Sequence, residues 1–157
     1  MNSVDLVIKG AKLPNGTVSD ICIQEQHVVD VVASFKGEAT QVIDASGCVV
    51  LPGLVDLHTH LREPGREDAE TVLSGSKAGA KGGFTALSAM ANTSPVADTA
   101  GVVEQVYRLG QEAGYLDVFP IGAVTQGLRG EALSEIGAMA DSVARVRVFS
   151  DDGHCVS

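Results

Sequence analysis

The sequence contains no tryptophan, and aromatic residues make up 4% of its 157 residues. It also lacks any apolar run of about 18 residues, the length that a membrane-spanning helix needs. Its first ten residues, MNSVDLVIKG, do not combine a basic segment with the apolar run of a signal peptide. We therefore expect a cytoplasmic protein without a membrane span or a secretory leader.

Cysteine and basic residues are also scarce. The three cysteines, Cys22, Cys48 and Cys155, are widely spaced and form no C-x-x-C pair, which predicts free thiols and argues against a disulfide scaffold. Lysine and arginine total 11 against 20 acidic residues, a formal net charge of −9. Such a charge repels phosphate groups, so we expect neither nucleic acid nor an anionic membrane as a partner.

Hydrophobic residues make up 45% of the chain, which is enough for a folded core. Short runs rich in β-branched residues are separated by turn signals in the first 50 residues, at 4–8, 18–23, 28–32 and 41–44. Runs of this length, bounded by turn residues, predict strands. We therefore expect residues 1–50 to form a small β-sheet module of the sandwich type.

The pattern changes after residue 50, where apolar strands alternate with helical segments. Strands are expected at 54–58, 84–90, 118–124 and 146–150, and helices at 67–81, 99–113 and 131–141. Asp98 and Thr99 are expected to cap the second helix. The alternation predicts an α/β fold with a parallel sheet in residues 51–157, either doubly wound or a (β/α)8 barrel. No glycine-rich phosphate motif follows the first strand, which weakens a nucleotide-binding interpretation.

Two histidines stand at the end of the first strand of this region, in the segment Asp56-Leu57-His58-Thr59-His60. Residues at i and i+2 of a strand point to the same face, so His58 and His60 are expected to project together. Imidazole is a common ligand of zinc-like cations. A pair of histidines at a loop edge is the ordinary alternative, but the position after a buried strand favours metal ligands.

Other polar residues follow the ends of the expected strands. The guanidinium of Arg62 can bind a carboxylate through two parallel hydrogen bonds, although a surface salt bridge is the simpler alternative. Asn92 suits a small polar substrate and equally suits a turn or a helix cap. Asp151 and Asp152 end the fourth strand, where a carboxylate can bridge two metals or simply belong to an Asp-Asp-Gly turn. Strand alternation does not choose between these two aspartates.

Three segments together resemble class I dihydroorotase of the amidohydrolase superfamily. They are VVLPGLVDLHTHLREPG (49–65), GGFTALSAMANTSPVAD (82–98) and VRVFSDDG (146–153). The resemblance implies the N-terminal half of a (β/α)8 TIM barrel, about its first four β/α units, preceded by the small β-module. It also implies His58, His60 and Asp152 as metal ligands, with Asp151 as the fallback, and His60, Arg62 and Asn92 as substrate contacts.

The family activity implied is the zinc-dependent, reversible cyclisation of N-carbamoyl-L-aspartate to dihydroorotate in pyrimidine biosynthesis, with one or two zinc ions per subunit. The resemblance places the remaining ligands and the acid/base group beyond Ser157. A barrel needs roughly 250 residues, so we expect this chain to be a fragment that is inactive alone, with Val146 and Val148 exposed. A homodimer or a complex with aspartate transcarbamoylase is the implied assembly. The alternatives are a hydantoinase- or allantoinase-like cyclic amidase and a non-catalytic homologue that scaffolds aspartate transcarbamoylase.

Overall fold

The computed structural model describes residues 3–154 and residue 156, so the expected free thiol of Cys155 lies outside the described residues. Cys22 and Cys48 are both free. The chain divides into two compact units, Met1–Pro52 and Gly53–Ser157. Within the described part of the chain, no helix combines the length and the apolar character needed to cross a membrane.

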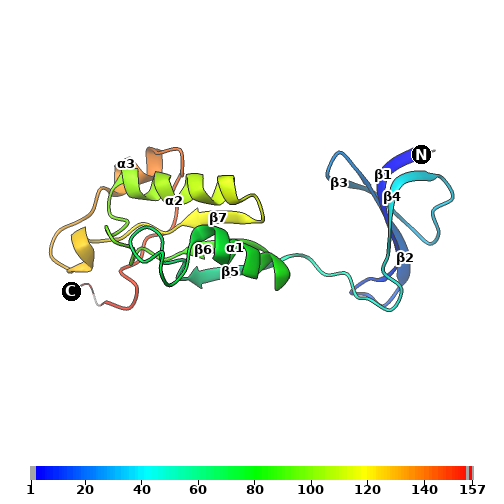
Figure 1. Cartoon of the computed structure of the whole chain (residues 1–157), viewed down its shortest axis with the longest axis horizontal. Coiled ribbons are helices and arrows are strands. Elements are labelled where there is room, and N and C mark those ends of the chain that lie inside the picture. Colours follow the sequence, from blue (N-terminus) through cyan, green and yellow to red (C-terminus); the bar gives the residue numbers. More distant parts are fainter. Residues whose placement is uncertain (1–2, 155, 157) are drawn as a thin grey trace. The chain divides into compact units, whose positions relative to one another are not determined.

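The first unit, drawn from blue to cyan in Figure 1, is a four-stranded sheet. Its strand order is β3-β2-β1-β4. β1 (Ser3–Lys12) pairs antiparallel with β2 (Val18–Gln24), and β2 pairs antiparallel with β3 (His27–Val32). β4 (Glu38–Asp44) runs parallel to β1. Each of the four runs predicted from the sequence lies within one of these strands.

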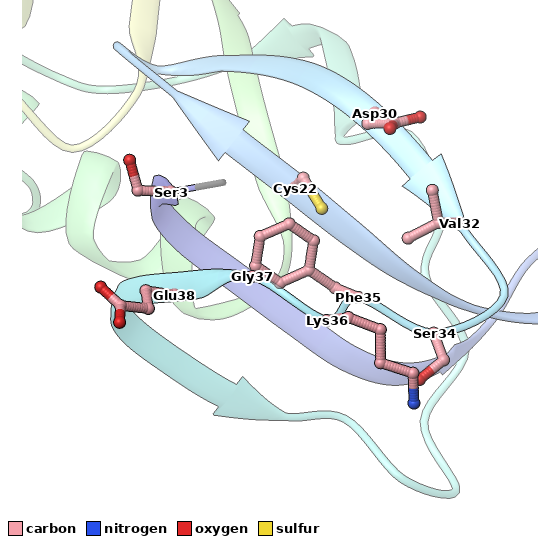
Figure 2. Close-up of a pocket in the computed structure, with 9 residues that line it drawn as sticks. All are labelled: Ser3, Cys22, Asp30, Val32, Ser34, Phe35, Lys36, Gly37 and Glu38. Carbon is pink, nitrogen blue, oxygen red and sulfur yellow. The ribbon is translucent and has the colours of Figure 1, made fainter. Parts of the chain in front are cut away.

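Two buried clusters pack on this sheet: one contains Val4, Val7 and Cys22, and the other contains Ala11, Ile21 and Ala45. Burial raises the pKa of the Cys22 thiol, which keeps it in the neutral form. An open pocket of ≈ 700 Å³ lies beside Cys22. Figure 2 shows the Phe35 ring next to Cys22, with the charged side chains of Asp30, Lys36 and Glu38 around it.

The second unit contains a parallel sheet with the order β5-β6-β7, formed by β5 (Leu54–Thr59), β6 (Phe84–Ala89) and β7 (Asp117–Pro120). Helices α1 (Val72–Lys81) and α2 (Ala100–Ala113) connect these strands and pack against each other and against the sheet (Figure 1). A buried cluster joins the two helices to the sheet through Leu61, Val72, Leu87, Ala89, Val106 and Val118. Consecutive strands are thus neighbours, and both crossover helices share one core.

Two of the three helices, α1 and α3, are shorter than the sequence pattern predicts. α1 begins at Val72 and not at 67, because Thr71 is an extended N-cap that forms a capping box with Ser74. The helix expected at 131–141 is reduced to α3 (Ile136–Asp141), because Ala132 and Ser134 bond to the backbone of residues 126 and 124. Thr99 occupies the N-cap of α2, but its side chain makes no capping hydrogen bond. The Asp98 carboxylate accepts from the backbone N–H of Gly127 and does not cap α2.

The third and fourth expected strands also differ from the prediction. β7 stops at Pro120, and beyond it the backbone of Gly122 bonds to Val148 at 3.1 Å. The fourth strand, expected at 146–150, does not form in the described chain, where this segment makes a single bridge between Phe149 and Gly122. Val148 is exposed as predicted, but the prediction for Val146 is wrong. That side chain is buried in a cluster with Met139, beside α2 and α3.

Candidate metal centre

β5 and the residue just beyond it present His58 and His60 on the same side, as the strand alternation predicts. Their ring centroids lie 5.2 Å apart with a T-shaped arrangement. The side chain of Asp56 does not join them, because its Oδ1 accepts a hydrogen bond from the His58 backbone N–H at 3.0 Å. This local bond fixes the backbone at the end of β5.

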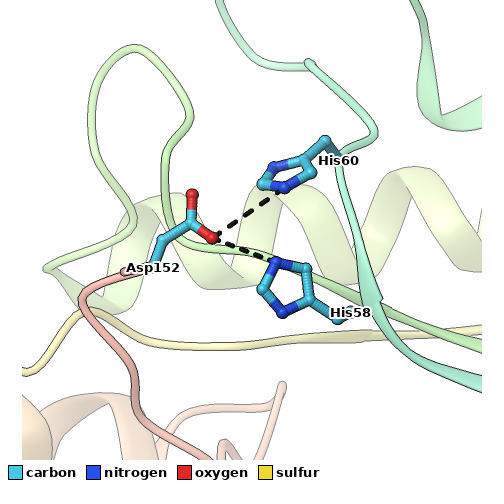
Figure 3. A group of neighbouring side chains, drawn as sticks. All are labelled: His58, His60 and Asp152. Atoms are coloured by element: carbon cyan, nitrogen blue, oxygen red, sulfur yellow. Dashed lines mark ion pairs between the residues drawn. The ribbon is translucent and has the colours of Figure 1, made fainter. Parts of the chain in front are cut away.

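Asp152 brings a carboxylate to the two imidazoles, as Figure 3 shows. Its Oδ1 lies 3.1 Å from His58 Nε2 and 3.8 Å from His60 Nε2. One ligand atom from each residue lies within 4.8 Å of the others. Two imidazole nitrogens and one carboxylate oxygen at this spacing suit a zinc-like divalent cation.

The structure separates the two aspartates that strand alternation left open. Asp152 faces the histidines and has a side chain 11% exposed. Asp151 is buried and turns to the backbone of residues 124 and 125. Burial by itself would raise the pKa of Asp151, but hydrogen bonds from Thr125 and Val124 outweigh it and hold that pKa below its ordinary value. Asp152 is therefore the aspartate that can share a metal with the histidines.

Asn92 lies in the loop after β6 and contacts His60 directly. Its Oδ1 is 2.9 Å from His60 Nδ1. With the amide oxygen as acceptor, the imidazole hydrogen sits on Nδ1, and the Nε2 lone pair faces Asp152. The sequence indicated a substrate role for Asn92, but it gave no sign of this contact, because the two residues are 32 positions apart.

Arg62 lies two residues beyond His60 and is half-buried, with φ +61°. Its side chain takes part in no ion pair or hydrogen bond found among the described residues. The salt-bridge alternative for Arg62 is therefore not seen, and its guanidinium remains available to a ligand.

The neighbouring Glu63 has a structural role that the sequence pattern did not reveal. Its Oε2 accepts from the backbone N–H of Val72 at 2.7 Å, at the start of α1.

A family model described as "Dihydro-orotase-like" matches residues 47–157, well over half of the chain. The chain belongs to the dihydroorotase-like family. The matched range includes the candidate site residues His58, His60, Arg62, Asn92, Asp151 and Asp152.

Several curated dihydroorotases are similar to this member of the family. That of Streptomyces coelicolor is 62% identical over 150 residues, covering 96% of this chain and 35% of that protein. That of Leifsonia xyli is 60% identical over 157 residues, covering 100% and 36%. That of Mycobacterium tuberculosis is 59% identical over 155 residues, covering 98% and 36%. The chain thus spans about a third of the length of the curated relatives it matches.

Solved structures of the amidohydrolase superfamily share its fold. An L-hydantoinase from Arthrobacter aurescens matches with a TM-score of 0.69 and 26% identity, over 80% of this chain and 29% of that one. An adenine deaminase matches with a TM-score of 0.60 and 23% identity, over 92% and 36%. The second likeness concerns the fold alone.

Proposed function

We propose that this chain supplies part of the active site of a dihydroorotase, which interconverts N-carbamoyl-L-aspartate and dihydroorotate in pyrimidine biosynthesis. The observation that carries the proposal is the approach of His58 Nε2 and His60 Nε2 to one oxygen of Asp152. It occurs in a chain 62% identical to a dihydroorotase over 150 residues.

The proposed architecture is the first part of a (β/α)8 barrel, preceded by the small sheet of residues 1–50. The consecutive order β5-β6-β7, with α1 and α2 in one shared core, supports this architecture over a doubly wound sheet. In a barrel of this kind the site lies at the carboxyl ends of the strands. His58 lies near the carboxyl end of β5, and His60 and Asn92 lie in the loops that follow β5 and β6.

In this proposal His58, His60 and Asp152 hold one or two zinc ions. A bound zinc ion would act as a Lewis acid toward the ring carbonyl and lower the pKa of water toward about 7. Asp152 would neutralise part of the cation's charge, and an Asn92 that accepts through Oδ1 would keep the hydrogen of His60 on Nδ1. These residues would thus orient the metal-binding nitrogen and oxygen atoms before the substrate binds.

Arg62 and Asn92 are proposed to bind the substrate carboxylate. The Arg62 guanidinium offers a bidentate fork. The Asn92 oxygen is occupied by His60, but its amide nitrogen retains two hydrogens that can be donated to a carboxylate. A substrate held in this way would present its cyclic amide beside the histidines.

Ring opening adds water across the amide C–N bond, so that the carbonyl carbon gains oxygen and the departing nitrogen gains a proton. None of the residues placed at this site is positioned here as the proton donor, and we propose that the acid/base group lies outside residues 1–157. A cytoplasmic homodimer, or a complex with aspartate transcarbamoylase, is the assembly proposed from the family.

The likeness to an L-hydantoinase at a TM-score of 0.69 favours one second candidate, the opening of another cyclic amide such as a hydantoin. Hydantoins without a carboxylate would not use the Arg62 fork. A substrate panel therefore separates the two candidates.

The gene product at its natural length, loaded with zinc, is assayed with dihydroorotate, a hydantoin and allantoin. The proposal predicts turnover of dihydroorotate, with kcat/KM far above that for the other two compounds. Preferential turnover of the hydantoin would favour the second candidate. Absence of turnover with dihydroorotate in a zinc-loaded, folded protein would refute the proposed function.

A further inference from the structure

Asp151 precedes Asp152 in the sequence. Its side chain is buried and faces away from the histidines. We propose that Asp151 is a positioning residue, which holds Asp152 in the orientation that the metal centre needs. The inference rests on the proposed metal site and adds to it a second carboxylate that binds no metal.

The Asp151 carboxylate is bonded on both of its oxygens. Oδ1 accepts from the backbone N–H of Val124 at 2.8 Å and of Thr125 at 3.0 Å. Oδ2 accepts from the Thr125 hydroxyl. Three donors on one buried carboxylate fix both its position and its rotamer.

The hydroxyl of Thr125 is itself held in place. Its side chain is 2% exposed, and its Oγ1 accepts from the backbone N–H of Gly130 at 2.9 Å. The hydroxyl hydrogen is therefore directed toward Asp151. This chain of bonds ties residues 151–152 to the segment that follows β7.

The backbone around Asp152 needs such an anchor. Asp152 has φ +52°, a left-handed conformation that costs free energy for any residue except glycine. No strand ladder supports it, because the preceding segment makes a single bridge, between Phe149 and Gly122. The local support consists of two bonds, from the Asp152 N–H to Ser150 Oγ and from the His154 N–H to the Asp151 carbonyl, each at 3.1 Å.

Asp151 therefore fixes the chain immediately before Asp152 in a segment without regular structure. If it were lost, Asp152 could relax from its positive φ toward the common negative φ, and its carboxylate would move from its 3.1 Å contact with His58 Nε2. Partners that orient a metal ligand typically contribute about 10- to 100-fold to metal affinity.

Two substitutions test this role in the gene product at its natural length. Asp151→Asn keeps the shape and one acceptor oxygen, but its amide group meets the Thr125 hydroxyl as a competing donor. Thr125→Val removes that hydroxyl at constant shape, and Thr125→Ser restores it. Asp141→Asn, at an exposed aspartate at the end of α3, is the matched control, and Asp152→Asn removes the proposed ligand.

The measurements are the zinc dissociation constant, obtained by competition with a chelator, the visible spectrum of the cobalt-substituted protein, and thermal melting by circular dichroism. We expect Asp151→Asn and Thr125→Val to weaken zinc binding by about 10- to 100-fold and to change the cobalt spectrum. Thr125→Ser and Asp141→Asn should match the unsubstituted protein. A merely structural residue would lower the melting temperature but leave the affinity and spectrum of the folded protein unchanged.

Failure of the inference and failure of the proposed function give different results. If Asp152→Asn loses zinc while Asp151→Asn and Thr125→Val bind it as tightly as the unsubstituted protein, the positioning role is wrong and the metal site stands. If Asp152→Asn binds zinc normally, the proposed metal site itself is wrong. Should Asp151→Asn fail to fold, the zinc affinities of Thr125→Val and Thr125→Ser test the positioning role instead. Equal affinities in these two variants would show that the role is wrong.

Discussion

At the scale of single residues, hydrogen bonds separate the polar side chains of the site into those already bonded and those available to a ligand. Asp56, Glu63 and Asp151 are bonded to backbone N–H groups. Arg62 has no such partner among the described residues. Sequence pattern cannot make this distinction for Glu63 and Asp151, because their bonding partners lie 9 and 27 residues away in the chain.

Arg62 leads to a prediction about substrate binding. Arg62→Lys in the gene product at its natural length should raise KM for dihydroorotate about tenfold or more, because a lysine is a point charge without the bidentate fork. Arg66→Lys is the matched control, since Arg66 is exposed and its ion pair is with Asp68 at 3.6 Å. An unchanged KM in Arg62→Lys would show that Arg62 does not bind the substrate carboxylate.

Asp20 leads to a prediction about acid stability. Its carboxylate accepts from the backbone N–H groups of Phe35 and Gly10, and these bonds hold the pKa of Asp20 below its ordinary value. Stability from a carboxyl with a lowered pKa is fully present above the unfolded-state pKa of about 3.9 and is lost as pH falls through the folded-state value. Asp20→Asn should therefore be less stable at pH 6 and show a shallower loss of stability from pH 6 to pH 3.

Urea unfolding followed by circular dichroism across that pH range measures this effect. Asp30→Asn is the control, because Asp30 is exposed and bonds to the N–H of its adjacent residue, Val31. It should keep the pH dependence of the unsubstituted protein. An Asp20→Asn protein with that same pH dependence would contradict the assignment.

At the scale of elements, two loops that carry site residues are packed closely together. The loop after β5 holds Arg62, and the loop after β6 holds Asn92. They meet where the Ser94 N–H donates to the Pro64 carbonyl at 2.9 Å. Gly65 has φ +101°, and a Cβ there would lie 2.2 Å from the Ser94 carbonyl oxygen. Only glycine fits this approach without a backbone shift.

Gly65→Ala should therefore displace the two loops and lower kcat/KM for dihydroorotate by about 10- to 100-fold, because small misplacements of substrate-binding groups are costly. Gly83→Ala is the control, since Gly83 has a similar φ of +87° but open space around its Cβ position. The Gly83→Ala substitution imposes similar backbone strain but creates no steric contact of the kind that a Cβ at Gly65 makes with Ser94. Equal activity in the two variants would show that the contact between the loops does not matter.

The elements themselves were largely predictable, because apolar patterns with a period of 2 residues indicate strands and those with a period of 3.6 residues indicate helices. The four short strands of the first unit and the three strands β5, β6 and β7 are present where apolar runs predict them. The segment 146–150 has the same apolar pattern but no strand, because a ladder needs partners that sequence periodicity does not report. The early starts predicted for α1 and α3 failed for a related reason, since capping and turn bonds override helical propensity.

The candidate site was only partly predictable. The spacing of His58 and His60 predicted their shared face, because strand geometry is local. The choice of Asp152 over Asp151 came from a resemblance, and the separation of the two depends on bonds to residues 124 and 125. The metal-ligand and substrate roles stay predictions.

At the scale of the whole molecule, the proposed activity depends on a metal centre to which His58, His60 and Asp152 contribute. The most direct test is the zinc content of the gene product at its natural length, measured by elemental analysis after purification. The double variant His58→Ala/His60→Ala should lose most of its bound metal. The chain provides a matched control, His27→Ala/His154→Ala, at its two other histidines, both exposed. We expect full zinc in the control and little in the His58/His60 variant. A full metal complement in both variants would show that His58 and His60 are not metal ligands.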